Sequence, residues 1–318
     1  MCRRAAAVPL ALAVASLPVS ALALAGYSVQ SFDEMKFVWC LLPFVAAYPP
    51  TFTLTVFQPA TFSFAPTRAQ QLAALRAAMA SAAGANSSLV LCPELFSTGY
   101  NPTVPFEGEP RGGPSYTAAG ALAAEFGVSL LFTYAESAGG RLFDAAVLFN
   151  RSGVALLDYR KVNLAPDGEA LVFAAGDGMA PVVDLDGIRV GVMICFDAFL
   201  PEPARILAVQ GADLVLVPTA NGYPPAVFNQ LAKLIVPARA LENSAFVAYA
   251  NWYQPNASID GLFTFYGQSV VSDPGGTLVY EGPSDRGDLA HVALNFTGKS
   301  PGNTAQGRPA GDTRGLCL

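Results

Sequence analysis

One unbroken apolar run, VGVMIC over residues 190–195, constrains the fold of this chain more than any other stretch. Apolar runs of this length are typical of a strand that is covered on both faces, because a strand with one solvated face alternates apolar and polar residues. Ligands in such sheets bind where strands end and loops begin. The run therefore predicts that the thiol of Cys195 lies at the carboxyl end of a buried strand, where a nucleophile would be placed.

Segments typical of strands and of helices alternate along the rest of the chain, which favours an α/β layered fold. Strands are expected at 51–58, 88–92, 128–135, 143–150, 154–159, 181–184, 188–195, 214–218, 246–251, 267–273 and 277–280, and helices at 66–83, 115–126, 202–210 and 227–243. We expect one folded domain over 50–297. The Gly-, Pro- and Thr-rich segment 298–318 is typical of a tail.

The composition argues against several classes of function. A net charge of -6, with no Lys/Arg cluster after Arg4, disfavours a nucleic-acid partner, which would need a basic face, and suits a small neutral or cationic substrate better. The five cysteines are unevenly spaced and fit neither a disulfide framework nor a zinc site. The single histidine, His291, disfavours Ser-His and Cys-His catalysis, so any nucleophile would need a different base.

Residues 1–49 have the features of a leader or targeting segment. Arg3 and Arg4 precede an uncharged Ala/Leu/Val stretch that ends in ALA at 23–25, the layout of a secretory signal. A membrane anchor over 5–25 is the alternative, although its alanines and prolines make it weakly hydrophobic. A second apolar run through residue 47 follows Met35, so translation from Met35 and a two-part targeting sequence stay open.

A leader would place the mature protein in the secretory pathway, outside the cell or in an organelle, whereas a chain without one would be cytoplasmic. We expect no stable membrane span in the mature chain. Four Asn-x-Ser/Thr triplets permit glycosylation on a secretory route; they begin at Asn86, Asn150, Asn256 and Asn295.

Three reactive side chains each stand at the end of an apolar run, namely Glu94, Lys161 and Cys195. Singly, they also fit a helix-start carboxylate, a surface lysine and an inert core thiol. Together they fit one mechanism. A free thiol has a pKa of about 8.5 and needs a base or a neighbouring cation to react at neutral pH. With one histidine in the chain, a carboxylate base and a lysine cation are the remaining way to supply both.

These residues resemble the nitrilase, or carbon-nitrogen hydrolase, superfamily over roughly residues 52–294. The resemblance rests on three ordered motifs, LCPELFSTGY (91–100), YRK (159–161) and GVMICFD (191–197). Flanking blocks also match, among them GADLVLVPTAN (211–221) and ARALEN (238–243). Within the superfamily, the chain is most similar to small aliphatic amidases of the omega-amidase and 5-aminopentanamidase kind.

The resemblance implies a role for each motif residue. Glu94 would be the general base, Cys195 the nucleophile, and Lys161 the cation that stabilises the oxyanion and favours the thiolate. The backbone N-H of Phe196 would be the second oxyanion donor. Glu169 falls where the family often carries a second carboxylate that orients the lysine, although Asp167 is near.

The pocket walls are less well marked in the sequence. Candidates come from loops that adjoin the matched motifs: Tyr100, Phe196, Asn221, Tyr223 and Trp252. The chain also departs from the family pattern at two positions, with Asn163 where relatives usually have histidine and Asp144 where many have asparagine. Neither is one of the three reacting groups, so we expect the departures to bear on loop packing, local pKa values and substrate preference more than on activity.

The resemblance also implies the architecture and the partners. The family fold is a four-layer α-β-β-α sandwich with two mixed sheets, and members commonly dimerise, so a homodimer or higher homo-oligomer is expected. The base, cation and nucleophile are all side chains, so we expect neither a metal nor an organic cofactor. The partner would be a small amide substrate.

Several functions remain open on the sequence alone. The first is an amidase that hydrolyses a small aliphatic carboxamide through a thioester and releases ammonia. Nitrile hydrolysis is its nearest rival, but Phe196 and Asp197 favour the amidase, because nitrilases of this family usually have tryptophan and then glutamate there. The sequence is also compatible with hydrolysis of an N-carbamoyl compound or a vitamin amide, and with a catalytically inactive scaffold.

Overall fold

The computed structural model describes residues 51–60, 66–100, 107–166, 168–222, 231–254 and 264–297. The expected leader, the tail, Asp167, Tyr223 and Asn256 lie outside the described residues, so these expectations stay predictions. Within the described ranges, no helix has both the length and the apolar character that crossing a bilayer requires.

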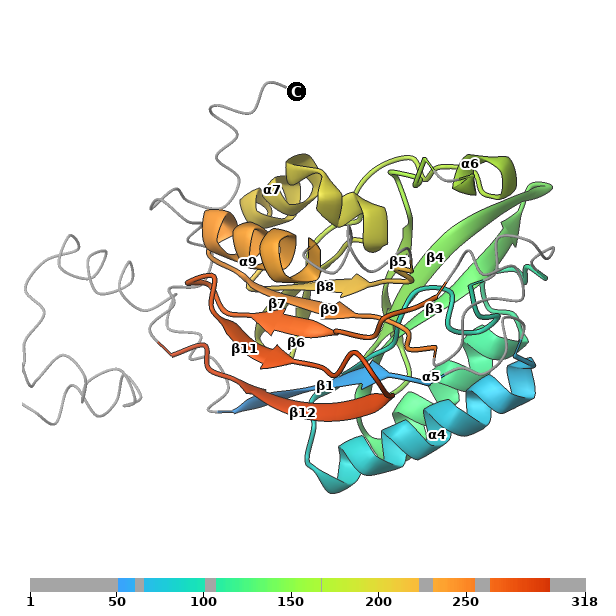
Figure 1. Ribbon diagram of the computed structural model, residues 1–318. Coiled ribbons are helices and arrows are strands. Elements are labelled where there is room, and N and C mark those ends of the chain that lie inside the picture. Colours follow the sequence, from blue (N-terminus) through green and yellow to red (C-terminus); the bar gives the residue numbers. More distant parts are fainter. Residues whose placement is uncertain are drawn as a thin grey trace, which may run out of the picture. The chain divides into compact units, whose positions relative to one another are not determined.

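The described residues form two six-stranded mixed sheets (Figure 1). The first has the order β12-β1-β2-β3-β4-β5 and consists of β1 (Phe52–Gln58), β2 (Leu89–Leu91), β3 (Ser129–Ala138), β4 (Arg141–Phe149), β5 (Ala155–Arg160) and β12 (Asp288–Leu294). The second has the order β11-β10-β9-β8-β7-β6 and consists of β6 (Val183–Leu185), β7 (Ile188–Val192), β8 (Leu214–Pro218), β9 (Phe246–Ala250), β10 (Val270–Ser272) and β11 (Leu278–Glu281).

The two sheets repeat one pattern of strand directions. Strands β1, β2 and β3 run parallel at the centre of the first sheet, and β7, β8 and β9 do so in the second. Antiparallel strands flank each parallel group on both sides. Parallel neighbours need a crossover connection, which explains why helices follow these strands in the chain.

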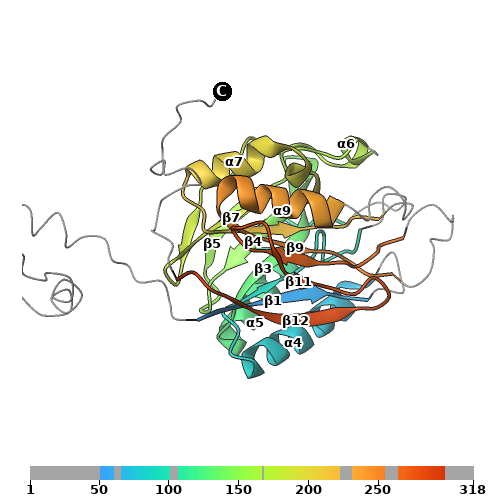
Figure 2. The same cartoon turned by 60° about the vertical axis from the view of Figure 1, so that its left-hand side comes forward.

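Four helices cover the outer faces of the sheets (Figures 1 and 2). Helices α4 (Arg68–Gly84) and α5 (Pro114–Phe126) pack on the first sheet, and α7 (Pro201–Val209) and α9 (Leu231–Asn243) pack on the second. Sequence signals mark their ends. Thr67 and Gln70 form a capping box at the start of α4, and Gly127 ends α5 in the left-handed conformation with φ 64°.

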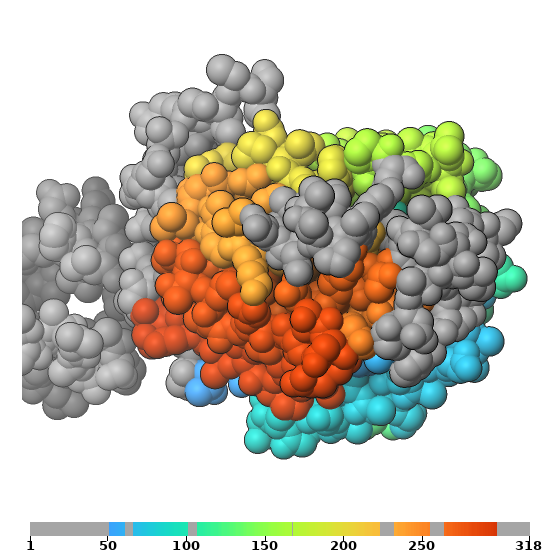
Figure 3. All heavy atoms as spheres, viewed as in Figure 1, coloured from blue at the N-terminus to red at the C-terminus, as the bar shows by residue number. Residues whose placement is uncertain are grey.

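The strands are buried on both faces, as the apolar runs predict. In β8, the side chains of Leu214 and Leu216 join the core between the sheets, whereas Val215 and Val217 join the core beneath α7 and α9. Helix α7 approaches β7 closely at Gly191, where an added Cβ would lie 3.0 Å from the side chain of Leu207. The layers are therefore α, β, β and α, with three apolar interfaces between them. Figure 3 shows a face whose centre is formed by residues 231–254 and 264–297, with α4 along its lower edge.

The expected strands and helices are present within a few residues, with three differences. Strand β12 was not predicted, because its stabilising partner is the remote β1, with which it pairs over seven residues. The short helix α6 (Glu169–Val172) lies between the strands expected at 154–159 and 181–184, where no helix was expected. The strand expected over 188–195 ends at Val192, because the chain then turns into the 3-10 helix η2 (Cys195–Phe199).

Truncation of a core leucine should measure how much packing between the two sheets contributes to the free energy of unfolding. Leu216 is fully buried, so we expect Leu216→Ala to lower the free energy of unfolding by about 2 to 5 kcal/mol through lost transfer energy and a residual cavity. Urea unfolding followed by circular dichroism checks this. Leu171→Ala is the matched control, since Leu171 is 91% exposed, and its change should stay within about 0.5 kcal/mol. Equal effects would contradict the layer assignment.

Candidate active site

Lys161 lies at the centre of a fully buried ionic cluster. It follows β5 directly, and its Nζ lies 2.7 Å from Oε1 of Glu94 and 2.7 Å from Oε1 of Glu169. Oδ2 of Asp144, on β4, lies 3.7 Å from the same nitrogen. Four ionisable groups from separate parts of the chain thus meet where strands end, in the place expected for Glu94 and Lys161.

Glu94 is held in place by contacts to both its backbone and its carboxylate. The N-H of Ala220, after β8, donates to Oε2 of Glu94 at 2.6 Å. The indole N-H of Trp252 donates to the backbone oxygen of Glu94 at 2.8 Å, and this indole stacks on Phe96 with 5.6 Å between ring centroids. Trp252 is thus a buried side chain that supports the backbone of Glu94, and its expected contact with substrate stays a prediction.

Glu169 is held from three directions. Its Oε1 accepts from Nζ of Lys161 at 2.7 Å and from the hydroxyl of Tyr100 at 3.0 Å, while its Oε2 accepts from the N-H of Ala165 at 2.7 Å. These bonds fix the carboxylate that faces the ammonium, so Glu169 can orient Lys161. The hydroxyl of Tyr100, a pocket candidate in the sequence, contacts Glu169 in this arrangement.

Cys195 stands in a constrained turn. Its φ is 44°, in the left-handed region that non-glycine residues rarely occupy, and such a conformation costs about 1 to 3 kcal/mol. The surrounding structure holds the turn through Asp197, whose carboxylate accepts from the N-H of Ile194 at 2.9 Å and from the hydroxyl of Tyr159 at 2.7 Å.

Asp197 also ties this turn to the loop that follows Lys161. The backbone N-H and the side-chain amide of Asn163 each donate to Oδ1 of Asp197 at 2.8 Å. The sequence marked Asn163 only as a departure and Asp197 only as a motif residue; their contact was missed. A carboxylate placed two residues after a candidate nucleophile was the one available signal, because a buried carboxylate must find donors.

Burial and charge decide the protonation states in the cluster. Burial, and then the charge of Glu94, raise the pKa of the Cys195 thiol well above its ordinary value, whereas Lys161 and the N-H of Ala220 lower it. Burial also raises the pKa of Glu94. For Lys161, burial lowers the pKa, but the negative groups around it outweigh burial and hold the pKa well above the ordinary value.

The thiol of Cys195 therefore lies beside a cation in surroundings that raise the pKa of the thiol. Lys161 acts on the thiol pKa in the direction expected from the sequence, although burial is the larger effect. A thiol whose pKa is raised by burial needs a general base in order to react as a nucleophile.

The remaining predicted residues have local contacts. The backbone N-H of Asn221 donates to Oδ1 of Asn251 at 2.8 Å, and the ring of Phe196 stacks on Phe199 with 5.2 Å between centroids. Their contacts with substrate stay predictions, as does the role of the Phe196 backbone N-H.

The acidic cluster is a poor metal site. Oxygens of Glu94, Asp144 and Glu169 lie within 4.8 Å of one another, a spacing that could suit a cation. However, the ammonium of Lys161 lies among the same oxygens and supplies the positive charge there. A divalent ion would have to displace it.

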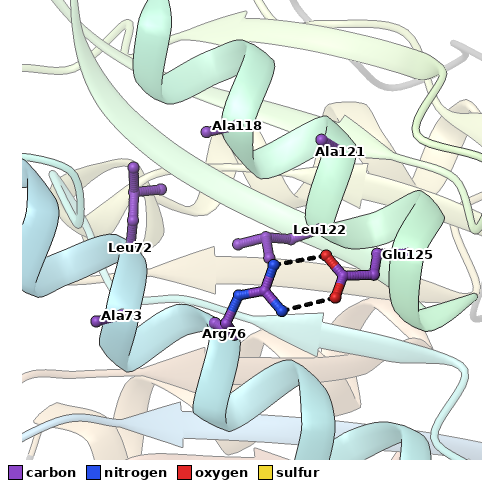
Figure 4. Close-up of a pocket in the computed structure, with 7 residues that line it drawn as sticks. All are labelled: Leu72, Ala73, Arg76, Ala118, Ala121, Leu122 and Glu125. Carbon is purple, nitrogen blue, oxygen red and sulfur yellow. Dashed lines mark hydrogen bonds and ion pairs between the residues drawn. The ribbon is translucent and has the colours of Figure 1, made fainter.

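A surface pocket between α4 and α5 lies apart from this chemistry. It has a volume of about 400 Å³, and its lining includes an ion pair between Arg76 and Glu125 at 2.6 Å (Figure 4). The other lining residues are small or apolar: Leu72, Ala73, Ala118, Ala121 and Leu122. None of the buried cluster contributes to it.

Comparison with known proteins identifies the family. The model of the carbon-nitrogen hydrolase family matches residues 53–297. This chain is a carbon-nitrogen hydrolase. It thus belongs to the nitrilase superfamily, as its three motifs implied.

Relatives of this carbon-nitrogen hydrolase include known enzymes. A Pseudomonas protegens protein named as the hydrolase in the pqqF 5′ region is 37% identical over 198 residues, which are 61% of this chain and 67% of the relative. An (R)-stereoselective amidase from a Pseudomonas species is 33% identical over 217 residues, which are 68% of this chain and 75% of the relative.

A solved structure of a relative shares the fold. The amidase from Nesterenkonia sp. AN1, in a mutant form with the acetamide moiety of fluoroacetamide added covalently at its active-site cysteine, matches with a TM-score of 0.68 and 27% identity. The match covers 78% of this chain and 93% of that chain. The expected sandwich of two mixed sheets with flanking helices is confirmed.

Removal of the lysine charge should slow the reaction of Cys195 with iodoacetamide. Lys161 lowers the pKa of the thiol, so Lys161→Met should reduce alkylation at neutral pH by up to about tenfold for each unit by which the pKa rises. Mass spectrometry of the labelled peptide measures the rate, with buried Cys92 as an internal reference. Lys233→Met, which removes a half-exposed lysine on α9, should leave the rate unchanged. Equal rates in both variants would contradict the electrostatic role.

Proposed function

We propose that this carbon-nitrogen hydrolase is an amidase that hydrolyses a small aliphatic carboxamide through a thioester on Cys195. The observation that carries the proposal is the buried cluster, which places the carboxylate of Glu94 and the ammonium of Lys161 2.7 Å apart beside the thiol of Cys195. The similarity to an (R)-stereoselective amidase and to the Nesterenkonia amidase supports the same reaction class.

The first half of the reaction forms the thioester. Glu94 takes the proton of the thiol as the sulfur of Cys195 attacks the carbonyl carbon, and the carbonyl oxygen becomes an oxyanion. Lys161 and the backbone N-H of Phe196 stabilise this oxyanion; one such donor contributes about 3 kcal/mol to transition-state binding. Glu94 then returns its proton to the amide nitrogen, the C-N bond breaks, and ammonia leaves.

The second half releases the acid. Glu94 takes a proton from a water molecule as that water attacks the thioester carbon, and a second tetrahedral intermediate forms. This intermediate collapses with cleavage of the C-S bond, and the proton held by Glu94 returns to the thiolate of Cys195. The net reaction converts an amide and water into a carboxylic acid and ammonia, and each proton passes through the same carboxylate.

A substrate panel tests the proposal. Purified protein is incubated with short aliphatic carboxamides, the matched nitriles and N-carbamoyl amino acids, and ammonia is measured. We expect turnover of the carboxamides, and loss of about a thousandfold or more in Cys195→Ala, since removal of the nucleophile leaves only binding and the oxyanion donors. Cys92→Ala, at the other described free cysteine, is the matched control and should retain activity.

The same panel distinguishes the amidase from its rivals. Turnover of nitriles alone would replace the amidase with a nitrilase, and ammonia from N-carbamoyl compounds alone would indicate a carbamoyl hydrolase. A folded protein that releases no ammonia from any of the three classes, and whose Cys195 reacts no faster than Cys92, would support an inactive scaffold.

We also propose that the chain self-associates after removal of its leader. Leu234 and Leu241 are about 60% exposed and lie on α9 two helical turns apart, which leaves an apolar strip on the outside of the second helical layer. Light scattering after size exclusion should give the mass of at least a dimer, and Leu234→Glu should shift the protein toward monomer.

Removal of the leader is tested separately. N-terminal sequencing of secreted material should give a mature protein that starts after residue 25. A secreted protein that still begins at residue 1 would contradict removal of the leader, and a monomeric wild-type protein would contradict self-association.

A further inference from the structure

The active site contains a third carboxyl group that the proposed reaction does not use. Asp144 lies on β4, opposite Ala135 of β3, and only 1% of it is exposed. The backbone oxygen of Asp144 accepts from the N-H of Lys161 at 2.8 Å, so the two residues are held together. Its side chain is therefore fixed beside the ammonium and cannot turn away to solvent.

The hydrogen bonds are unevenly distributed over the three carboxyl groups. Each of Glu94 and Glu169 accepts from Lys161 at 2.7 Å and from at least one further donor. Among the described residues, neither carboxyl oxygen of Asp144 has a hydrogen-bond partner, and its 3.7 Å separation from Nζ of Lys161 is too long for a good hydrogen bond.

Charge balance then indicates which group is neutral. Oxygens of the three carboxyl groups lie within 4.8 Å of one another, and Lys161 is the one cation in contact with them in the described part of the chain. A buried carboxylate without donors is strongly disfavoured, whereas a carboxylic acid supplies its own donor to a neighbouring acceptor. Like charges in one buried site favour retention of a proton by one of the groups.

We propose that Asp144 carries a proton in the resting enzyme and donates it in a hydrogen bond to the carboxylate of Glu94. Asp144 is thereby a positioning residue for the general base. This inference rests on the function proposed for Glu94. The hydrogen bond keeps the carboxylate of Glu94 ionised and oriented toward the thiol of Cys195, while Lys161 remains available to stabilise the oxyanion.

The electrostatic environment agrees with this assignment. Burial, followed by the charge of Glu94, raises the pKa of Asp144 well above its ordinary value, and Lys161 opposes the rise. The proximity of the two side chains acts in the other direction on Glu94, whose pKa is raised by burial and lowered by its contact with Asp144. The titratable groups that surround Asp144 are Glu94 after β2, Tyr159 and Lys161 at the end of β5, Glu169 on α6 and, across Lys161, Cys195 on η2.

Two substitutions at this position should separate a neutral donor from a negative charge. Asp144→Asn keeps an uncharged donor of the same shape, and kcat should stay within about threefold of the wild type. Asp144→Leu removes the donor, and kcat should fall about tenfold to a hundredfold with little change in KM, because a hydrogen bond to a charged group is lost. An unchanged kcat in Asp144→Leu, or an equal fall in both variants, would overturn the proposal.

The pH dependence of stability gives a reading that needs no activity. A carboxyl group whose pKa is raised by folding binds more protons in the folded state, so the stability it contributes is lost as pH rises above its unfolded value of about 3.9. The variant Asp144→Asn has no ionisable group at this position, so its stability does not decrease with pH for this reason. Its melting temperature relative to wild type should therefore increase from acidic to neutral pH, whereas the exposed control Asp184→Asn should show no such trend. A flat difference at both positions would overturn the proposal.

Infrared spectroscopy locates the proton directly. Wild-type enzyme at neutral pH should show the carbonyl stretch of a buried protonated carboxyl group, which should shift when aspartate is isotopically labelled at its side-chain carboxyl carbon and vanish in Asp144→Asn. The labelling needs no variant, so the test survives if a variant does not fold. If the frequency of this band did not change on labelling, or if no such band were present, the proposal would be overturned. Absence of amidase activity would instead reject the proposed function and leave this reading intact.

Discussion

The structure of this site depends on one buried cation. The ammonium of Lys161 has no solvent access, and its free energy is acceptable only because two carboxylates lie 2.7 Å away and a third carboxyl group lies 3.7 Å away. Removal of one partner from such a cluster typically costs about 3 to 5 kcal/mol, since it leaves an uncompensated buried charge. The cluster therefore requires that β2, β4, β5 and α6 all be in place, which couples the chemistry to the integrity of the fold.

The paired sheets explain how the reactive groups meet. Glu94 follows β2 of the first sheet, while Cys195 follows β7 and Ala220 follows β8 of the second. All three strands belong to the parallel centres of their sheets, and residues at the ends of parallel strands lie along one edge. The N-H of Ala220 donates to Glu94 across the two sheets at 2.6 Å, so the sandwich places the carboxylate of Glu94 and the thiol of Cys195 relative to each other.

Cys195 is held in a strained conformation that the surrounding contacts maintain. The carboxylate of Asp197 accepts four hydrogen bonds, from Ile194, Tyr159 and twice from Asn163. These bonds connect the turn at Cys195 to the segment that carries Lys161.

Local sequence patterns determined the α/β class, most strand and helix positions, and the three reactive side chains at the ends of apolar runs. They could do so because burial on two faces and helical periodicity are properties of short windows. Only the tertiary structure decided the contacts between distant residues. The bond from Ala220 to Glu94 spans 126 positions and that from Tyr100 to Glu169 spans 69. For the same reason, the sequence did not predict strand β12, the hydrogen bonds of Asp197 or the position of Asp144 in the ionic cluster. A residue's charge state and partners depend on what folding places beside it, and no short window contains that information.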